Sequence, residues 1–99
     1  MRIKDCREEI DRIDGELLRL LNRRALLALE VGELKSRAGL PLKDEGRERE
    51  VLSRSSVANA GPLGDGSVAR IFRRIIRESR RVEEHAREAR GAQVCGAKR

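Results

Sequence analysis

The sequence predicts an all-α protein with three helices per chain, one of them very long, entwined into a homodimer. Two observations lead to this prediction. Apolar residues recur at alternating spacings of three and four along residues 4–38, which is the period of one helix face. The 99-residue chain has one Phe and no Tyr or Trp. Its core must therefore come from aliphatic residues, which suits helices packed on helices.

The first helix is expected over residues 4–38. Its apolar stripe is unbroken except at one position, which holds Arg24. Gly39 and Pro41 then stop the helix. The apolar positions of the stripe are Ile3, Cys6, Ile10, Ile13, Leu17, Leu20, Leu27, Val31, Leu34 and Ala38.

The length of this helix predicts the homodimer. A helix of this length spans roughly 50 Å at about 1.5 Å per residue. A compact chain of this size has a radius of gyration of about 13 Å. The rest of the chain is too short to cover such a helix, so we expect its apolar stripe to be buried against a second copy.

A second helix is expected after Asp44, a good N-cap residue, and fades near Ser56. Residues 59–67 are rich in Gly and Pro and predict a loop. A third helix begins after Asp65 or Ser67. We expect residues 1–90 to form one helical domain and residues 91–99 a flexible C-terminal tail.

The net charge of +6 favours anionic partners in general, although most of such a surplus on a small helical protein is a solvated face. With almost no aromatic side chains for base stacking, we expect no nucleic-acid partner. The N-terminus has no apolar run, so we expect neither a signal peptide nor a membrane span. The two cysteines, Cys6 and Cys95, have no metal-ligand spacing and suit a reducing, cytoplasmic compartment.

Two cations lie on the apolar face of the first helix. Lys35 follows Arg24 by eleven residues, on nearly the same side of the helix. Together they could bracket a small anion, since a buried guanidinium is costly unless it is paired. Alternatively, Arg24 pairs with an acidic residue of a neighbouring helix or extends to water. The stripe of the third helix also turns polar, at Ser79 and Glu83, which suggests that both polar positions border one cavity.

Asp44, Arg47 and Glu48 cluster at the expected start of the second helix, where free backbone N–H groups can hold a ligand oxygen. A solvated charged turn is the alternative. His85 is expected on the exposed side of the third helix. The sequence has no metal cluster, no Gly-rich phosphate loop and no nucleophile with its base. An enzyme built this way would use fixed charges, for a rearrangement or elimination of an anionic substrate.

Three segments resemble the all-helical class of chorismate mutases. They are REEIDRIDGELLRLLNRRALLALEVGELK (7–35), PLKDEGREREVL (41–52) and IFRRIIRES (71–79). The shared motifs are R followed by I-D-x-I-D, a paired RR, V-G-x-x-K, D-x-x-R-E and I-I-x-x-S. The resemblance covers Arg7 to Glu83. It implies a homodimeric isomerase of phenylalanine and tyrosine biosynthesis, in the shikimate pathway, that converts chorismate to prephenate without a metal or cofactor.

The resemblance also implies roles for single residues. Arg24 and the Arg7 of the partner chain would hold the two carboxylates of chorismate. Lys35 would bind the ether oxygen and a carboxylate, and Ser79 would contact a carboxylate. Glu83 would address the ether oxygen from the other side.

At the other end of the site, Glu48 and the backbone of Asp44 would take the ring hydroxyl, with Arg47 supporting Glu48. Holding both carboxylates selects the reactive conformer of the substrate. Lys35 would then stabilise the negative charge that develops on the ether oxygen.

Two positions depart from the pattern of the family. Many members have Gln where this chain has Glu83, and a carboxylate can help only when it is protonated, which requires burial to raise its pKa. Arg80 stands where an apolar residue is common, and it could face either the pocket or the solvent.

Two other functions stay open at this stage. An isochorismate pyruvate-lyase would share the fold and similar charges, although the intact DEGRERE segment favours a substrate with a ring hydroxyl. A basic, non-catalytic helical module that binds nucleic acid or a protein is the other alternative.

Overall fold

The computed structural model describes residues 1–97, with side chains described up to Gly91. This part of the chain contains three helices and no strand: α1 (Ile3–Arg37), α2 (Glu45–Ala58) and α3 (Asp65–Ala97). The all-α fold with one very long helix is therefore confirmed, and each helix begins within one or two residues of its predicted start.

The end of α3 differs from the expectation. The helix continues to Ala97, whereas the sequence predicted that a tail begins near Gly91. A single glycine costs a helix only about 1 kcal/mol relative to Ala, which is too little to end a long helix by itself. That residues 91–99 are flexible stays a prediction, and residues 98 and 99 lie outside the described part.

Two helix caps fix the loop between α1 and α2. Gly39 has a φ of 70°, and the N–H of Leu40 donates to the carbonyl of Lys35 at 2.8 Å. This is the Schellman ending that a glycine permits. The Oδ1 of Asp44 accepts a hydrogen bond from the backbone N–H of Arg47 at 3.0 Å, which confirms Asp44 as the N-cap of α2.

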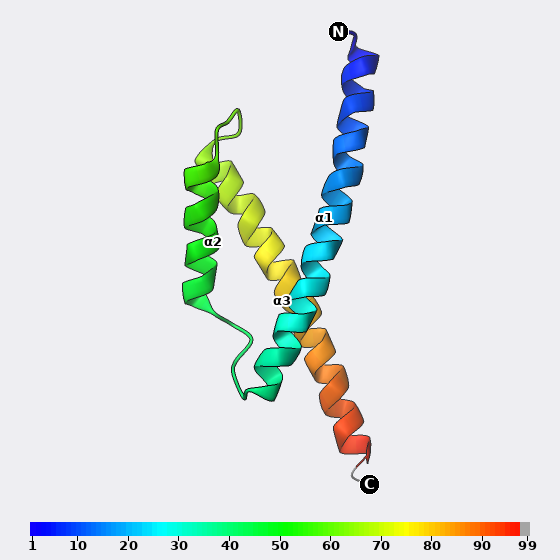
Figure 1. Ribbon diagram of the computed structural model, residues 1–99, viewed down its shortest axis with the longest axis vertical. Coiled ribbons are helices and arrows are strands. Elements are labelled where there is room, and N and C mark those ends of the chain that lie inside the picture. Colours follow the sequence, from blue (N-terminus) through cyan, green and yellow to red (C-terminus); the bar gives the residue numbers. More distant parts are fainter. Residues whose placement is uncertain (98–99) are drawn as a thin grey trace.

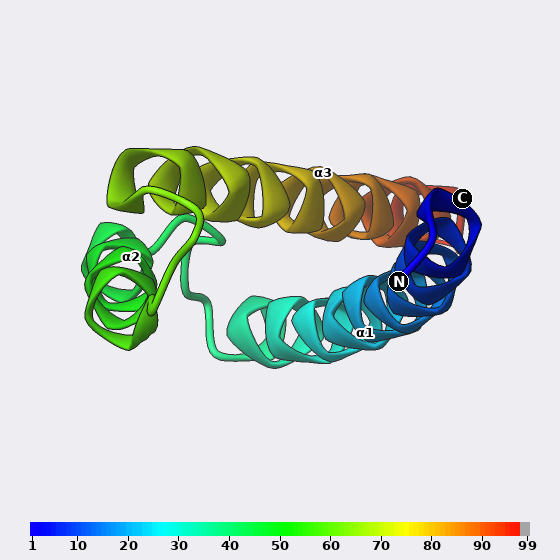
Figure 2. The same cartoon turned by 90° about the horizontal axis from the view of Figure 1, so that it is seen from above.

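The three helices form an open, elongated arrangement. α1 and α2 each pack against α3 and not against each other. Figure 1 shows α1 crossing α3, and Figure 2 shows α1 and α2 on the same side of α3. The radius of gyration is 17.8 Å, and the molecule measures 65 × 29 × 15 Å. A compact chain of this length would have a radius of gyration of about 13 Å.

The chain buries very little apolar surface of its own. Val68 is the one buried hydrophobic residue among the described side chains. Along the N-terminal half of α1, which projects away from α3 (Figure 1), the apolar stripe is open: Ile10, Leu17 and Leu20 each keep about half of their surface exposed. None of the described helices has a stretch apolar enough and long enough to cross a membrane.

Candidate active site

One cavity of about 310 Å³ lies between the three helices. This is at the small end of the range of ligand pockets, about 300–1,000 Å³. Its apolar lining includes Leu27, Val31 and Ile76. Seven of the eight site residues predicted from the sequence also line it: Arg24, Lys35, Asp44, Arg47, Glu48, Ser79 and Glu83.

The polar interruptions of α1 and α3 meet in this cavity. The guanidinium of Arg24 donates a hydrogen bond from Nη1 to the Oγ of the buried Ser79 at 2.9 Å. Among residues 1–91, no carboxylate lies within 4.0 Å of the Arg24 guanidinium. The acidic partner that the sequence left open is therefore not seen in this part of the chain, and Arg24 keeps donors for a ligand.

Lys35 is held by the loop that the two caps define. Its Nζ donates to the carbonyl oxygen of Leu42 at 2.9 Å. An ammonium has three N–H groups, so this bond orients the side chain and leaves two donors for a ligand. The ammonium has no carboxylate partner within 4.0 Å among the side chains described. The carbonyl of Leu42 is a contact that the sequence pattern gives no means of finding.

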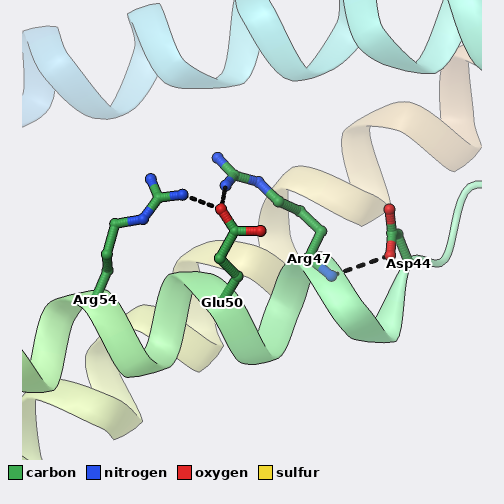
Figure 3. A network of polar contacts seen from close by, with 4 residues as sticks. All are labelled: Asp44, Arg47, Glu50 and Arg54. Carbon is green, nitrogen blue, oxygen red and sulfur yellow. Dashed lines mark hydrogen bonds and ion pairs between the residues drawn. The ribbon is translucent and has the colours of Figure 1, made fainter.

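At the α2 end of the cavity, Glu48 forms an ion pair with Arg80 of α3. The expectation that Arg47 supports Glu48 is wrong. Its guanidinium donates to Oε1 of Glu50 at 3.0 Å, and Arg54 contacts the same oxygen (Figure 3). Residues three or four apart lie on one side of a helix, so Arg47 meets Glu50 more readily than its neighbour Glu48. Because it pairs with Glu48 and lines the cavity, Arg80 faces the cavity and not the solvent, a choice that the sequence left undecided.

Glu83 of α3 lines the cavity near Lys35 and packs against Gly32 of α1. Gly32 makes this approach possible: it is the buried residue of α1, and a Cβ built on it would lie 3.2 Å from Cγ of Glu83. An isolated glycine within a helix often has such a packing reason.

Burial raises the pKa of the Glu83 carboxyl above its ordinary value of 4.5, because the ionised form loses hydration. Four nearby cations act in the opposite direction but do not cancel this effect: Lys35, Arg80, Arg87 and Arg24. The pKa of Glu83 is thus shifted in the direction that the sequence analysis required. A protonated carboxyl can donate a hydrogen bond into the cavity.

Arg7 is the predicted site residue that does not reach the cavity of its own chain. It lies exposed on α1, seventeen residues before Arg24, which is roughly 25 Å along the helix. Its contribution from a partner chain stays a prediction.

These features define the class of protein: a small all-helical domain with a cavity lined by cations, a serine hydroxyl and a carboxyl of raised pKa. Residues 6–84 match the family model described as chorismate mutase type II. The chain therefore belongs to the type II chorismate mutase family.

Relatives and solved structures agree with this assignment. The chain is 51% identical over 77 residues to a bifunctional chorismate mutase/prephenate dehydratase of Neisseria gonorrhoeae, and 45% identical over 78 residues to that of Aquifex aeolicus. The matches cover 78% and 75% of this chain but only 21% and 22% of those proteins, so the chain spans about a fifth of their length. The structure of chorismate mutase (form II) from Thermus thermophilus superposes with a TM-score of 0.83 at 39% identity, covering 85% of this chain and 96% of that one.

The raised pKa of Glu83 predicts a pH-dependent effect on stability. A carboxyl whose pKa is higher in the folded state stabilises the fold below its unfolded pKa, and this contribution is lost as the pH rises through the folded pKa. Glu83→Gln removes the ionisation. Thermal unfolding should therefore show the variant gaining stability relative to wild type as the pH rises from 4.5 towards neutrality.

Glu84→Gln is the matched control, because Glu84 is the exposed neighbour of Glu83. This variant should follow the pH dependence of the wild type. A constant difference between Glu83→Gln and wild type over this range would contradict the raised pKa of a half-buried carboxyl at position 83.

Proposed function

We propose that this chain catalyses the rearrangement of chorismate to prephenate, in the cytoplasmic biosynthesis of phenylalanine and tyrosine. The observation on which this rests is that Arg24 and Lys35 face one small cavity with no carboxylate within 4.0 Å among the described side chains. Both residues are half-buried, and cations withdrawn from water without acidic partners are unfavourable unless a ligand neutralises them. A dicarboxylate such as chorismate supplies that charge, and the family assignment points to the same substrate.

In this proposal, the cations of the site bind both carboxylates of chorismate and thereby hold the substrate in its reactive conformation. Arg24 binds one carboxylate with the donors that its hydrogen bond to Ser79 leaves free. The serine hydroxyl limits the motion of the guanidinium, so less freedom is lost on binding. Fixing both ends of a flexible substrate brings the reacting carbon atoms together, and this proximity accounts for a large share of the rate.

The second contribution is electrostatic. The ether oxygen gains negative charge as its bond to carbon breaks. Lys35 approaches it with an ammonium already oriented by the carbonyl of Leu42. Protonated Glu83 donates a hydrogen bond from the opposite side. Donors that are placed in advance stabilise the transition state more than the ground state, and only such differences raise kcat.

At the α2 end, we place the ring hydroxyl of the substrate against Glu48 and the backbone of Asp44. Both residues line the cavity at the first turn of α2. This end determines which cyclic dicarboxylates fit, because a site built to accept a hydroxyl hydrogen discriminates strongly against substrates that lack the group.

We also propose that the active enzyme is a homodimer in which each cavity is completed by Arg7 of the second copy. The exposed apolar stripe on the N-terminal half of α1 supports this, since a lone chain leaves that surface in water. Four cations line the cavity of one chain, but Arg47 and Arg80 each pair with a carboxylate, on Glu50 and Glu48. Arg24 is then the one unpaired guanidinium left for two carboxylates while Lys35 binds the ether oxygen.

The function is tested by adding purified protein to chorismate and following the loss of its absorbance together with prephenate formation. Lys35→Gln should lower kcat/KM by about 100- to 1,000-fold, the usual effect of removing one transition-state donor. Lys43→Gln is the control and should stay near wild type, because Lys43 is exposed and pairs with Glu45. Turnover of isochorismate to pyruvate instead, or binding of nucleic acid without turnover, would overturn the proposal.

Subunit complementation tests the shared site. Arg7→Ala and Arg24→Ala should each be nearly inactive as homodimers. After the two are unfolded together and refolded, random pairing makes half of the dimers mixed, and each mixed dimer has one intact site. About a quarter of the wild-type activity should return. A mixture as inactive as its components would show that Arg7 does not act across the interface.

The protonation of Glu83 predicts the pH profile of catalysis. Because burial raises its pKa, the protonated fraction increases as the pH falls below neutrality, and kcat should increase with it. Glu83→Gln should flatten the profile, since an amide donates at every pH. A wild-type profile that is flat from about pH 5 to about pH 8 would contradict the role of Glu83.

A further inference from the structure

Arg80 joins the two walls of the cavity at the hydroxyl end. It comes from α3, and its Nη2 donates to Oε2 of Glu48 on α2. Both side chains line the cavity and are largely shielded, with 24% of Arg80 and 28% of Glu48 exposed. The other ion pairs among the described side chains lie between residues at least 45% exposed. The Arg80–Glu48 pair is therefore the one of this set that is largely withdrawn from water.

No other described cation is within 4.0 Å of Glu48. Arg47, the neighbour on the same helix, is engaged with Glu50 on the face drawn in Figure 3. Arg54 contacts that same Glu50 oxygen, so Glu50 is the carboxylate that these two arginines of α2 share. The orientation of Glu48 thus depends on a residue from another helix, thirty-two positions away in the sequence.

We infer that Arg80 is a positioning residue of the active site, which holds Glu48 ready to accept the hydroxyl of the substrate and cancels its charge. This inference rests on the proposed function. The planar guanidinium fixes a carboxylate more firmly than an ammonium can. Because the hydrogen bond is made to Oε2, the other oxygen, Oε1, is left to accept from the substrate.

The charge of Arg80 matters as much as its geometry. An unpaired Glu48 would place a negative charge in the cavity that must admit a dianion, and like charges in a poorly hydrated site repel each other strongly. The Arg80 guanidinium makes the pair neutral. It therefore allows a carboxylate to serve as a hydroxyl acceptor in a site that is otherwise built for anions.

A double-mutant cycle with chorismate as substrate tests this role. The four proteins are wild type, Arg80→Met, Glu48→Gln and the double variant. Arg80→Met should lower kcat/KM by about 10- to 100-fold, as expected for a lost charge-assisted hydrogen bond. If Arg80 acts through Glu48, the double variant should be within about twofold of Glu48→Gln.

Two further variants separate positioning from a general structural effect. Arg81→Met removes the adjacent arginine, which is 65% exposed and forms an ion pair only with Glu78 among the described side chains. This variant should stay within about twofold of wild type. Arg80→Lys keeps the charge without the planar fork. The Arg80→Lys variant should reverse most of the increase in KM, because KM reports the repulsion between Glu48 and the anionic substrate. It should restore less of the decrease in kcat.

Circular dichroism and thermal unfolding are measured on every variant, and Arg80→Lys replaces Arg80→Met in the cycle if the latter does not fold. Losses that multiply in the double variant, or an Arg80 variant with wild-type kcat/KM, would overturn the inference while the proposed function stands. No turnover by the wild type would instead overturn the proposed function, and this inference with it.

Discussion

The structure depends on one electrostatic constraint, which is that α1 presents cations on the face that should be apolar. Arg24 and Lys35 line the cavity beside Leu27 and Val31, and neither has a carboxylate partner in the described part of the chain. A protein bears the cost of such an arrangement when a ligand supplies the missing charge. The neutral contacts that these two residues do make, to a hydroxyl and to a carbonyl, orient the cations without neutralising them.

The backbone around the cavity follows from the same constraint. Lys35 lies in the last turn of α1, and the Schellman ending at Gly39 turns the chain so that the Leu42 carbonyl returns to its ammonium. Asp44 then starts α2 close to that point. One short connection therefore orients a cation and places the first turn of α2 beside it. In this loop, structural and functional requirements concern the same few residues.

Much of this could be predicted from the sequence, because periodicity and caps are local signals. The span of α1 and the cap at Asp44 follow from residue spacing. The polar positions in the two apolar stripes also suggested that Arg24 and Ser79 border one cavity, although their direct hydrogen bond depends on how α1 and α3 cross. The ion-pair partner of Glu48 could not be predicted from the sequence, because the choice between Arg47 and Arg80 depends on how α2 and α3 cross. The approach of Gly32 to Glu83 depends in the same way on the α1–α3 crossing. The continuation of α3 past Gly91 shows how weakly one glycine opposes helix growth.

The lack of packing between α1 and α2 has a consequence for how such a site can change over time. In the proposed function, Arg24 and Lys35 of α1 bind negative charge and Glu48 of α2 takes the ring hydroxyl, while α3 supplies a residue that contacts each end, Ser79 beside Arg24 and Arg80 beside Glu48. Substitutions in the first turn of α2 can accumulate without disturbing the cations. If the proposed roles hold, selection can change which ring substituents the α2 end accepts while the cations of α1 that bind the carboxylates are retained.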